Sequence, residues 1–167
     1  MRKLILSLAL FAVVVGASAQ SNIIKTNPFG LAYGNFNVTY ERVLNPSASF
    51  LVKGNYMYKL LGLDVSLAGL GVGYRYYITH AKKETPNGFY VNPQVAFAFG
   101  SIKDNNDTSY SATNFGIGAE LGYQWVWSSG FTLDLGIGPM YNFVSSDSSD
   151  SANGIAPALT LAIGYAF

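Results

Sequence analysis

Residues 114–127 read NFGIGAELGYQWVW, and every second residue of this stretch is apolar. The residues between them are small or polar. Because successive side chains of a β-strand point to opposite faces, this alternation predicts one long strand with two different faces. The apolar parity holds Phe115, Ile117, Ala119, Leu121, Tyr123, Trp125 and Trp127, and the other holds Asn114, Gly116, Gly118, Glu120, Gly122 and Gln124.

The same alternation recurs along the chain and predicts about eight strands. They span residues 22–31, 34–44, 48–59, 66–79, 88–102, 112–127, 131–145 and 153–167. The first is the least regular, because Asn27-Pro28-Phe29-Gly30 interrupts it. Short connections such as 45–47 and 128–130 alternate with longer or more polar ones. This order of links and an even strand number indicate an all-β fold, an antiparallel up-and-down barrel that crosses an outer membrane.

A soluble barrel such as a lipocalin also alternates, so the residues on each face decide between the two. The less apolar face holds mainly Gly, Ala, Asn, Gln and Thr, which suit the narrow interior of an eight-stranded barrel. Aromatic residues gather toward both ends of the apolar face, with aliphatic residues between them, as in a wall that faces lipid. The predicted girdles contain Tyr40, Tyr74, Tyr76, Trp125 and Trp127 toward the periplasm and Tyr56, Phe97 and Tyr141 toward the outside.

Residues 1–19 have the three parts of an export signal. Met1-Arg2-Lys3 is basic, residues 4–15 are almost all apolar, and Ala17-Ser18-Ala19 supplies the small residues that signal peptidase reads. The apolar run is too short to span a bilayer comfortably. We therefore expect a signal peptide that is cleaved after Ala19, a barrel domain of residues 20–167, and location in the cell outer membrane.

Composition excludes several classes of function. The 167 residues are 50% hydrophobic and 11% charged, with ten basic and nine acidic residues, so no basic surface for nucleic acid is expected. The chain has no Cys, which rules out disulfides, thiolate catalysis and lipid attachment at a cysteine. No metal-ligand spacing and no phosphate-binding glycine motif is present, and we expect no cofactor.

The carboxyl-terminal stretch resembles the terminal strand signal of bacterial outer-membrane barrels. Its alternating residues are Leu159, Leu161, Ile163, Tyr165 and Phe167. The whole chain is similar to small outer-membrane barrels of the A, X and W types. Two stretches, Ile24-Lys25-Thr26-Asn27-Pro28 and Gly71-Val72-Gly73-Tyr74-Arg75-Tyr76-Tyr77, most resemble uncharacterised small barrels of the Bacteroidetes. That resemblance implies recognition by periplasmic chaperones and the barrel-assembly machinery, and contact with outer-membrane lipid and lipopolysaccharide.

Three prolines depart from the regular strand pattern. Pro93, Pro139 and Pro157 lack the N–H that a central ladder uses, and we expect local bulges at these positions.

Five charged residues fall on the parity that faces the lumen, with Lys25 as a less certain sixth. They are Glu41, Lys53, Arg75, Glu120 and Asp134. Buried charges are stable only when they are paired and hydrogen-bonded. The first interpretation is a structural network that fills the barrel, and the second is a gate or proton path. Arg42 and Lys59 lie on the outward parity near strand ends, where long side chains reach the lipid headgroups.

Three functional classes follow. The first is a monomeric structural or surface-interaction barrel with a filled lumen, and the second is a narrow channel or a lateral conduit for small apolar molecules. The third, a lipid-modifying enzyme, is the remotest, because the one histidine, His80, falls in a charged periplasmic turn. Asp- and Asn-containing loops at 104–107 and 147–151 form turns, with divalent-cation binding as an alternative.

Overall fold

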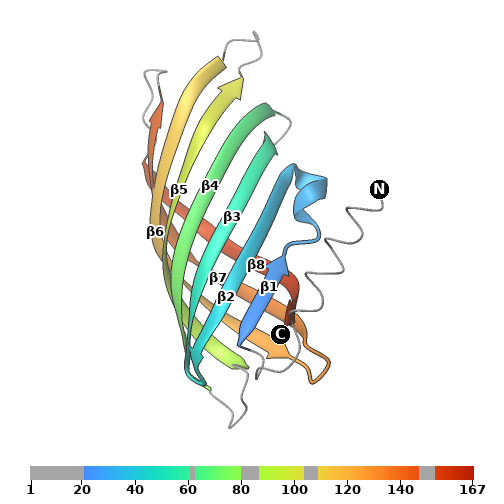
Figure 1. The fold of residues 1–167 in the computed structure, drawn as a ribbon. Coiled ribbons are helices and arrows are strands. Elements are labelled where there is room, and N and C mark those ends of the chain that lie inside the picture. Colours follow the sequence, from blue (N-terminus) through green and yellow to red (C-terminus); the bar gives the residue numbers. More distant parts are fainter. Residues whose placement is uncertain (1–20, 61–62, 80–86, 104–108, 147–152) are drawn as a thin grey trace, which may run out of the picture.

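The computed structural model describes residues 21–60, 63–79, 87–103, 109–146 and 153–167. In this part of the chain eight antiparallel strands close into a barrel, each paired with its neighbours in sequence and β1 with β8 (Figure 1). The predicted eight-stranded antiparallel barrel is confirmed. The strands are β1 (Asn22–Thr26), β2 (Asn35–Asn45), β3 (Ala48–Leu60), β4 (Leu63–Tyr77), β5 (Gly88–Lys103), β6 (Ser109–Val126), β7 (Phe131–Ser146) and β8 (Gly154–Ala166), with a short 3-10 helix, η1 (Gly30–Tyr33).

The two ends of the barrel differ. The connections β2–β3, β4–β5 and β6–β7 lie at one end, together with the start of β1 and the carboxyl terminus, and we call this the turn end (Figure 1). The connections β3–β4, β5–β6 and β7–β8 lie at the opposite end, the loop end. The predicted signal segment 1–19 with its cleavage site, His80, and residues 104–107 and 147–151 fall outside the described residues.

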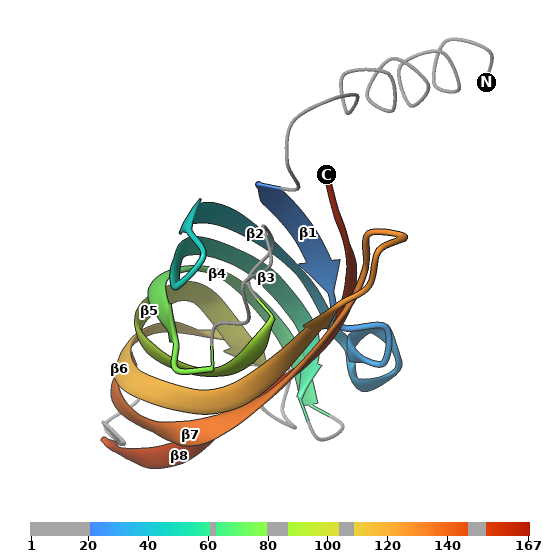
Figure 2. The same cartoon turned by 90° about the horizontal axis from the view of Figure 1, so that it is seen from below.

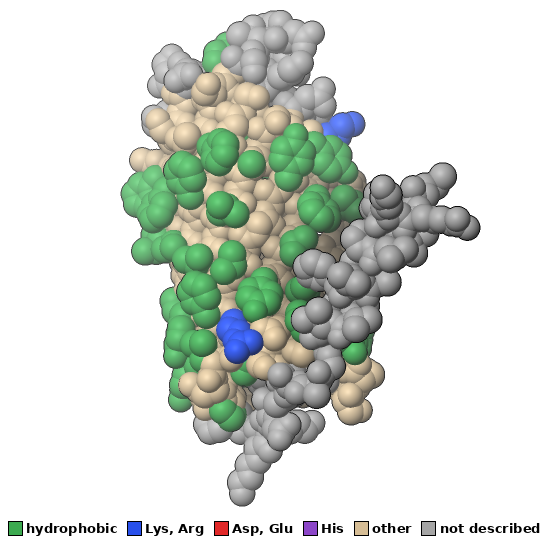
Figure 3. Space-filling model, viewed as in Figure 1, with side chains coloured by type: hydrophobic (Ala, Val, Ile, Leu, Met, Phe, Trp, Pro, Cys, Tyr) green, Lys and Arg blue, Asp and Glu red, His purple; other side chains and the backbone are tan. Residues whose placement is uncertain are grey.

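The wall is apolar outside and polar inside. Leu70 is 67% exposed on the outer face, whereas Glu41 is 0% exposed in the lumen. Hydrophobic side chains spread over the outer surface in Figure 3, and no acidic side chain is in view on that face. Within the described part of the chain, no helix has the length and hydropathy needed to cross a bilayer.

The first strand is shorter than the predicted range 22–31. It ends at Thr26, because the carbonyl and side chain of Asn27 accept hydrogen bonds from the N–H groups of Gly30 and Phe29 and begin a turn. η1 follows and lies outside the wall beside the end of β1 (Figure 2). Gly34 then returns the chain to β2 with φ of 80°, and a side chain there would collide with the backbone of Lys59.

The short first strand leaves a gap in the wall. β1 pairs with β8 only from Ile23–Ala166 to Thr26–Ile163, whereas both β2 and β8 continue toward the loop end. Residues 155–161 of β8 therefore border a gap in the wall, and its other border is formed by residues 35–38 of β2 together with Asn27 and Gly30, which lie against Asn37 and Asn35. We call this gap the wall opening.

The register does not shift at the three prolines, so the expected bulges are not found there. The β4–β5 ladder is nevertheless interrupted between Gly73–Gln94 and Tyr76–Val91, beside Pro93, and the β6–β7 ladder between Gly118–Met140 and Leu121–Ile137, beside Pro139. The β5–β6 register continues through Pro93, and the β7–β8 register continues through Pro139, which lies opposite Pro157. Two opposed prolines fit a non-hydrogen-bonded pair, in which both nitrogens point away from the shared ladder. The register shifts instead between Val43 and Asn45 in β2 and between Met57 and Lys59 in β3. β4 and β6 also begin earlier than predicted, because their ladders extend to Leu60–Leu63 and Lys103–Ser109.

Candidate functional site

The lumen collects the charged side chains. Every acidic residue whose side chain the structure describes is buried there, namely Glu41, Glu120 and Asp134. Lys25 and Arg75 lie beside them, each with a side chain that is 1% exposed. Arg42 and Lys59, by contrast, are exposed on the outward parity. The interior therefore holds a charge cluster that its surroundings must neutralise.

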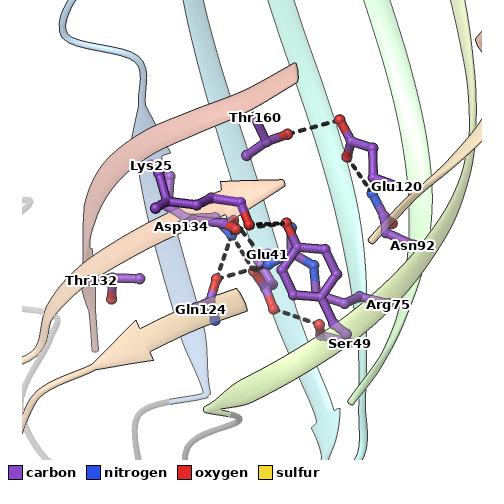
Figure 4. A network of polar contacts seen from close by, with 12 residues as sticks. Lys25, Glu41, Ser49, Arg75, Asn92, Glu120, Gln124, Thr132, Asp134 and Thr160 are labelled. Carbon is purple, nitrogen blue, oxygen red and sulfur yellow. Dashed lines mark hydrogen bonds and ion pairs between the residues drawn. The ribbon is translucent and has the colours of Figure 1, made fainter. Parts of the chain in front are cut away.

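Two cations and two carboxylates form the centre of this cluster (Figure 4). The Lys25 Nζ atom lies 2.5 Å from Glu41 Oε2 and 2.6 Å from Asp134 Oδ2. The Arg75 guanidinium lies 2.9 Å from the same Asp134 oxygen and 3.3 Å from Glu41 Oε2. The formal charges of the four groups sum to zero, which is the condition under which buried charges persist.

Neutral side chains satisfy the remaining oxygens. Ser49 Oγ and Tyr77 Oη donate to Glu41 Oε1 at 2.5 and 2.7 Å. The Gln124 side-chain oxygen accepts from both Lys25 and Arg75, and its nitrogen donates to Tyr77 Oη at 2.8 Å. The carboxylate of Glu41 is thus held from several sides.

Tyr90 contacts the cluster in two ways. Its hydroxyl donates to Asp134 Oδ1 at 2.8 Å, and Arg75 Cζ lies 3.7 Å from the centre of its ring. Gly122 and Gly136 make room for this ring, because a Cβ at Gly136 would lie 2.5 Å from the hydroxyl and one at Gly122 would be closer still. Tyr90 is therefore both a hydrogen-bond donor and a stacking surface for the guanidinium.

The cluster, which we call the lumenal plug, joins seven of the eight strands. Its members are Lys25 of β1, Glu41 of β2, Ser49 of β3, Arg75 and Tyr77 of β4, Tyr90 of β5, Gln124 of β6 and Asp134 of β7. Toward the turn end the buried side chains of Ile23, Val126 and Ala166 pack together. Polar and apolar groups together fill this half of the barrel.

A second ion pair lies nearer the loop end. Lys53 Nζ is 3.2 Å from Glu120 Oε2 and 2.6 Å from the side-chain oxygen of Gln94. Asn92 and Thr160 donate to the two Glu120 oxygens at 3.1 and 2.9 Å. The Lys53 side chain is 26% exposed, so it forms part of the floor of an open space.

That space is a cavity of about 450 Å³, which we call the vestibule. Lys53 and Glu120 are part of its lining. A second cavity, of about 310 Å³, shares the lining residues Asn55, Met57 and Ala96 with it. Asn27, Asn35 and Asn37 line one side of the vestibule, and residues 157–162 of β8 line another. The vestibule therefore extends to both borders of the wall opening.

Comparison with protein families accounts for most of the chain. The family model described as Protein of unknown function (DUF3575) matches residues 4–155. The chain belongs to the DUF3575 family. No curated protein and no solved structure shows a significant match to this DUF3575 chain. All residues of the lumenal plug lie inside the matched segment, whereas most of β8 follows it.

The five predicted lumenal residues of this DUF3575 barrel separate into two groups. The structure brings Glu41, Arg75 and Asp134 together, and it places Lys53 and Glu120 in the second pair. Lys25, the less certain sixth residue, contacts both carboxylates of the plug.

The other predicted positions lie on the outer face. Seven of the eight girdle residues are exposed there, and Trp125 is half-buried beside Tyr123, with ring centres 4.3 Å apart. Leu159, Leu161 and Tyr165 of the terminal stretch are exposed, and Ile163 and Phe167 are half-buried. The backbones of Phe167 and Asn22 exchange two hydrogen bonds, of 2.8 and 3.0 Å, which tie β8 to β1.

Sequence reasoning missed the neutral members of the plug in this DUF3575 protein. The prediction places tyrosines only in the girdles and therefore omits Tyr77 and Tyr90. Tyr77 shares the parity of Arg75, and Tyr90 shares the parity of Asn92 and Gln94, so parity was the signal that marked them as lumenal. Among the described residues no group of three or more His, Cys, Asp and Glu side chains is arranged to hold a metal ion.

Proposed function

We propose that this chain is an integral outer-membrane barrel with a filled lumen and a structural or surface-interaction role. One observation carries the proposal: the described acidic side chains are buried and neutralised inside, while large apolar side chains cover the outside. A soluble protein has the opposite arrangement, since large exposed apolar surfaces promote association in water. A hydrocarbon environment favours an apolar wall around a polar interior.

The plug supports a lumen that is closed to ions. Its charged and hydrogen-bonded side chains extend from seven strands across the turn-end half, and their exposed fractions are close to zero. Eight-stranded interiors are just wide enough for side chains to fill. A structural role therefore agrees with this geometry better than a pore does.

Export and assembly complete the proposal. We propose cleavage after Ala19, recognition of the terminal residues Leu159–Phe167 by periplasmic chaperones and the assembly machinery, and insertion as a monomer. The turn end would face the periplasm and the loop end the lipopolysaccharide. Catalysis is not part of the proposal, because in the described lumen the carboxylates of Glu41 and Asp134 are held by cations. Hydrolysis or acyl transfer on labelled lipid A would contradict this.

Two measurements test the proposed location and the closed lumen. The full chain, expressed in a Gram-negative host, should fractionate with the outer membrane and migrate faster on gels before heating than after it. The purified barrel should carry little current in planar bilayers. Recovery in a soluble fraction would refute the membrane location, and a large steady conductance would replace the structural role by a pore.

The wall opening favours a second candidate function, a lateral conduit for small apolar molecules. The lumenal plug closes the turn end, so a molecule in the vestibule would exchange with the bilayer or the outside rather than with the periplasm. Transfer of an apolar dye from the bilayer into the lumen, without ion current, would support this candidate.

A further inference from the structure

The backbone of β8 is incompletely paired at the wall opening. The N–H of Ala166 donates toward β7, to the carbonyl of Gly130, and the N–H of Phe167 donates toward β1, to that of Asn22. Because N–H directions alternate along a strand, residues 155, 157, 159 and 161 direct their backbone groups toward the opening. Within the described chain, the β1–β8 ladder ends at Thr26–Ile163, so these groups have no strand partner.

Two prolines reduce the number of donors along this unpaired stretch. Continuing the ladder would place Pro28 opposite Leu161, and Pro28 has no N–H to donate. Pro157 directs its nitrogen toward the opening, so one potential donor is absent there. The remaining N–H and C=O groups still need hydrogen-bonding partners, because hydrocarbon supplies none.

The vestibule behind the opening has a mixed polar and apolar lining that carries almost no net charge. Its polar lining consists mainly of side-chain amides, among them Asn27, Asn37 and Asn55, and its charged pair, Lys53 and Glu120, is mutually neutralised. Asn35 also lines the vestibule, and its side-chain oxygen is buried without a hydrogen-bond partner. A cavity of about 450 Å³ is within the range of small-molecule sites.

The rim outside the opening is apolar. Ile155 and Leu159 are 75% and 70% exposed on β8, and Phe29 and Leu31 are exposed on the segment beside β1 that contains η1. Figure 2 shows that segment outside the wall, where it would flank a chain leaving the opening. A cavity with amide groups in its lining thus lies behind an apolar outer rim.

We propose that the wall opening and the vestibule bind a single-chain amphipathic lipid with a neutral, hydroxyl-rich headgroup. The headgroup lies in the vestibule, where it donates to the side-chain amides of the lining and to the free carbonyls of β8. The acyl chain passes through the opening and extends along Leu159 into the bilayer. A neutral headgroup is favoured over a carboxylate, because Lys53 is already paired with Glu120. This inference rests on the membrane location proposed above.

Photolabelling of the full chain in phosphatidylcholine vesicles tests the site. The probe is a monoacylglycerol with a photoreactive diazirine in its acyl chain, and labelled peptides are identified by mass spectrometry. We expect labelling concentrated on residues 155–161 and 29–33. Unlabelled monoacylglycerol should compete, whereas glycerol and a fatty acid of equal chain length should compete at least about tenfold more weakly.

A matched pair of variants separates the site from the general lipid surface. Ala158 lines the vestibule, so Ala158→Phe should fill the headgroup site and reduce focused labelling about tenfold. Ala68 has the outward parity in β4, and Ala68→Phe should leave the labelling unchanged. Both variants are first checked for the heat-modifiable migration of a folded barrel.

The possible failures are distinguishable. Even labelling around the wall, or labelling that persists in folded Ala158→Phe, would overturn the site while leaving the membrane location intact. Equal competition by the fatty acid would overturn the neutral headgroup. Failure of the chain to insert into vesicles would overturn the membrane location, and this inference with it.

Discussion

The Arg75 guanidinium stacks on the ring of Tyr90, with Cζ 3.7 Å from the ring centre, and both side chains bind the carboxylate of Asp134. This triangle joins β4, β5 and β7 across the lumen. Substituting each of these three residues removes a different interaction. Single variants therefore separate the contributions of charge, hydrogen bonding and ring packing to the stability of the barrel.

Arg75→Ala should destabilise the barrel by about 3–5 kcal/mol, because Glu41 and Asp134 then lose one of their two cations in a buried site. Denaturant unfolding in vesicles, followed by Trp fluorescence, measures the loss. Arg42→Ala is the control: Arg42 is exposed and binds Asn22, and its removal should cost no more than about 0.5 kcal/mol. Ion conductance should rise in Arg75→Ala, and equal stability of the two variants would contradict the plug.

Tyr90→Phe should cost less than Arg75→Ala. The ring that stacks on Arg75 stays, and only the hydrogen bond to Asp134 is lost, for which about 1.5–3 kcal/mol is typical of a charged acceptor. The same unfolding assay measures the difference in the free energy of unfolding between the two variants. A loss as large as that of Arg75→Ala would show that the hydroxyl, rather than the ion pairs, dominates the plug.

Gly122→Ala should destabilise the barrel by about 1–3 kcal/mol, because the new methyl group would collide with the Tyr90 hydroxyl and the Leu135 carbonyl. Gly54→Ala is the matched control, since a Cβ there would meet only the Val38 carbonyl at 3.9 Å. Thermal unfolding of both proteins provides the comparison, and equal stability would show that Tyr90 adopts another position.

Deletion of Phe167 should reduce the amount of folded protein in the outer membrane. The deletion removes both the last residue of the proposed assembly signal and the two backbone hydrogen bonds to Asn22. Refolding the purified variant in detergent separates these effects, because only the second operates there. Assembly in cells at the parental level would refute the signal.

Cysteine labelling tests the orientation. Asn153→Cys at the loop end should react with an impermeant maleimide on intact cells, whereas Ser129→Cys in the β6–β7 turn should react only after the outer membrane is opened. The chain has no native Cys to interfere. The reverse labelling pattern would show that the barrel has the opposite orientation in the membrane.

The sequence predicts which face of a strand a residue occupies. It does not predict the position of that residue along the barrel axis. Alternation indicates that Glu41, Lys53 and Arg75 all face the lumen. Whether two such residues meet depends on the stagger between strands, which turns and ladder registers determine. The pairing of Lys53 with Glu120 rather than with Glu41 is therefore a property of the closed barrel.

The first strand shows another limit. Residues 22–31 contain enough apolar residues to read as one strand, and the interruption at Asn27-Pro28 was visible. The gap in the wall cannot be predicted from this interruption, because the wall opening exists only where β8 continues past the end of β1. Local sequence can predict where a strand stops, whereas a gap depends on the length of a distant neighbour.

The position of Lys25 links neutralisation of the plug to completion of the fold. Lys25 and Asp134 are 109 residues apart in the chain, and they meet only when β1 has joined β8. An open sheet, or a sheet that closed two residues out of step, would leave Asp134 without Lys25 as one of its two cations. Correct closure is therefore the state in which all four charges of the plug are paired.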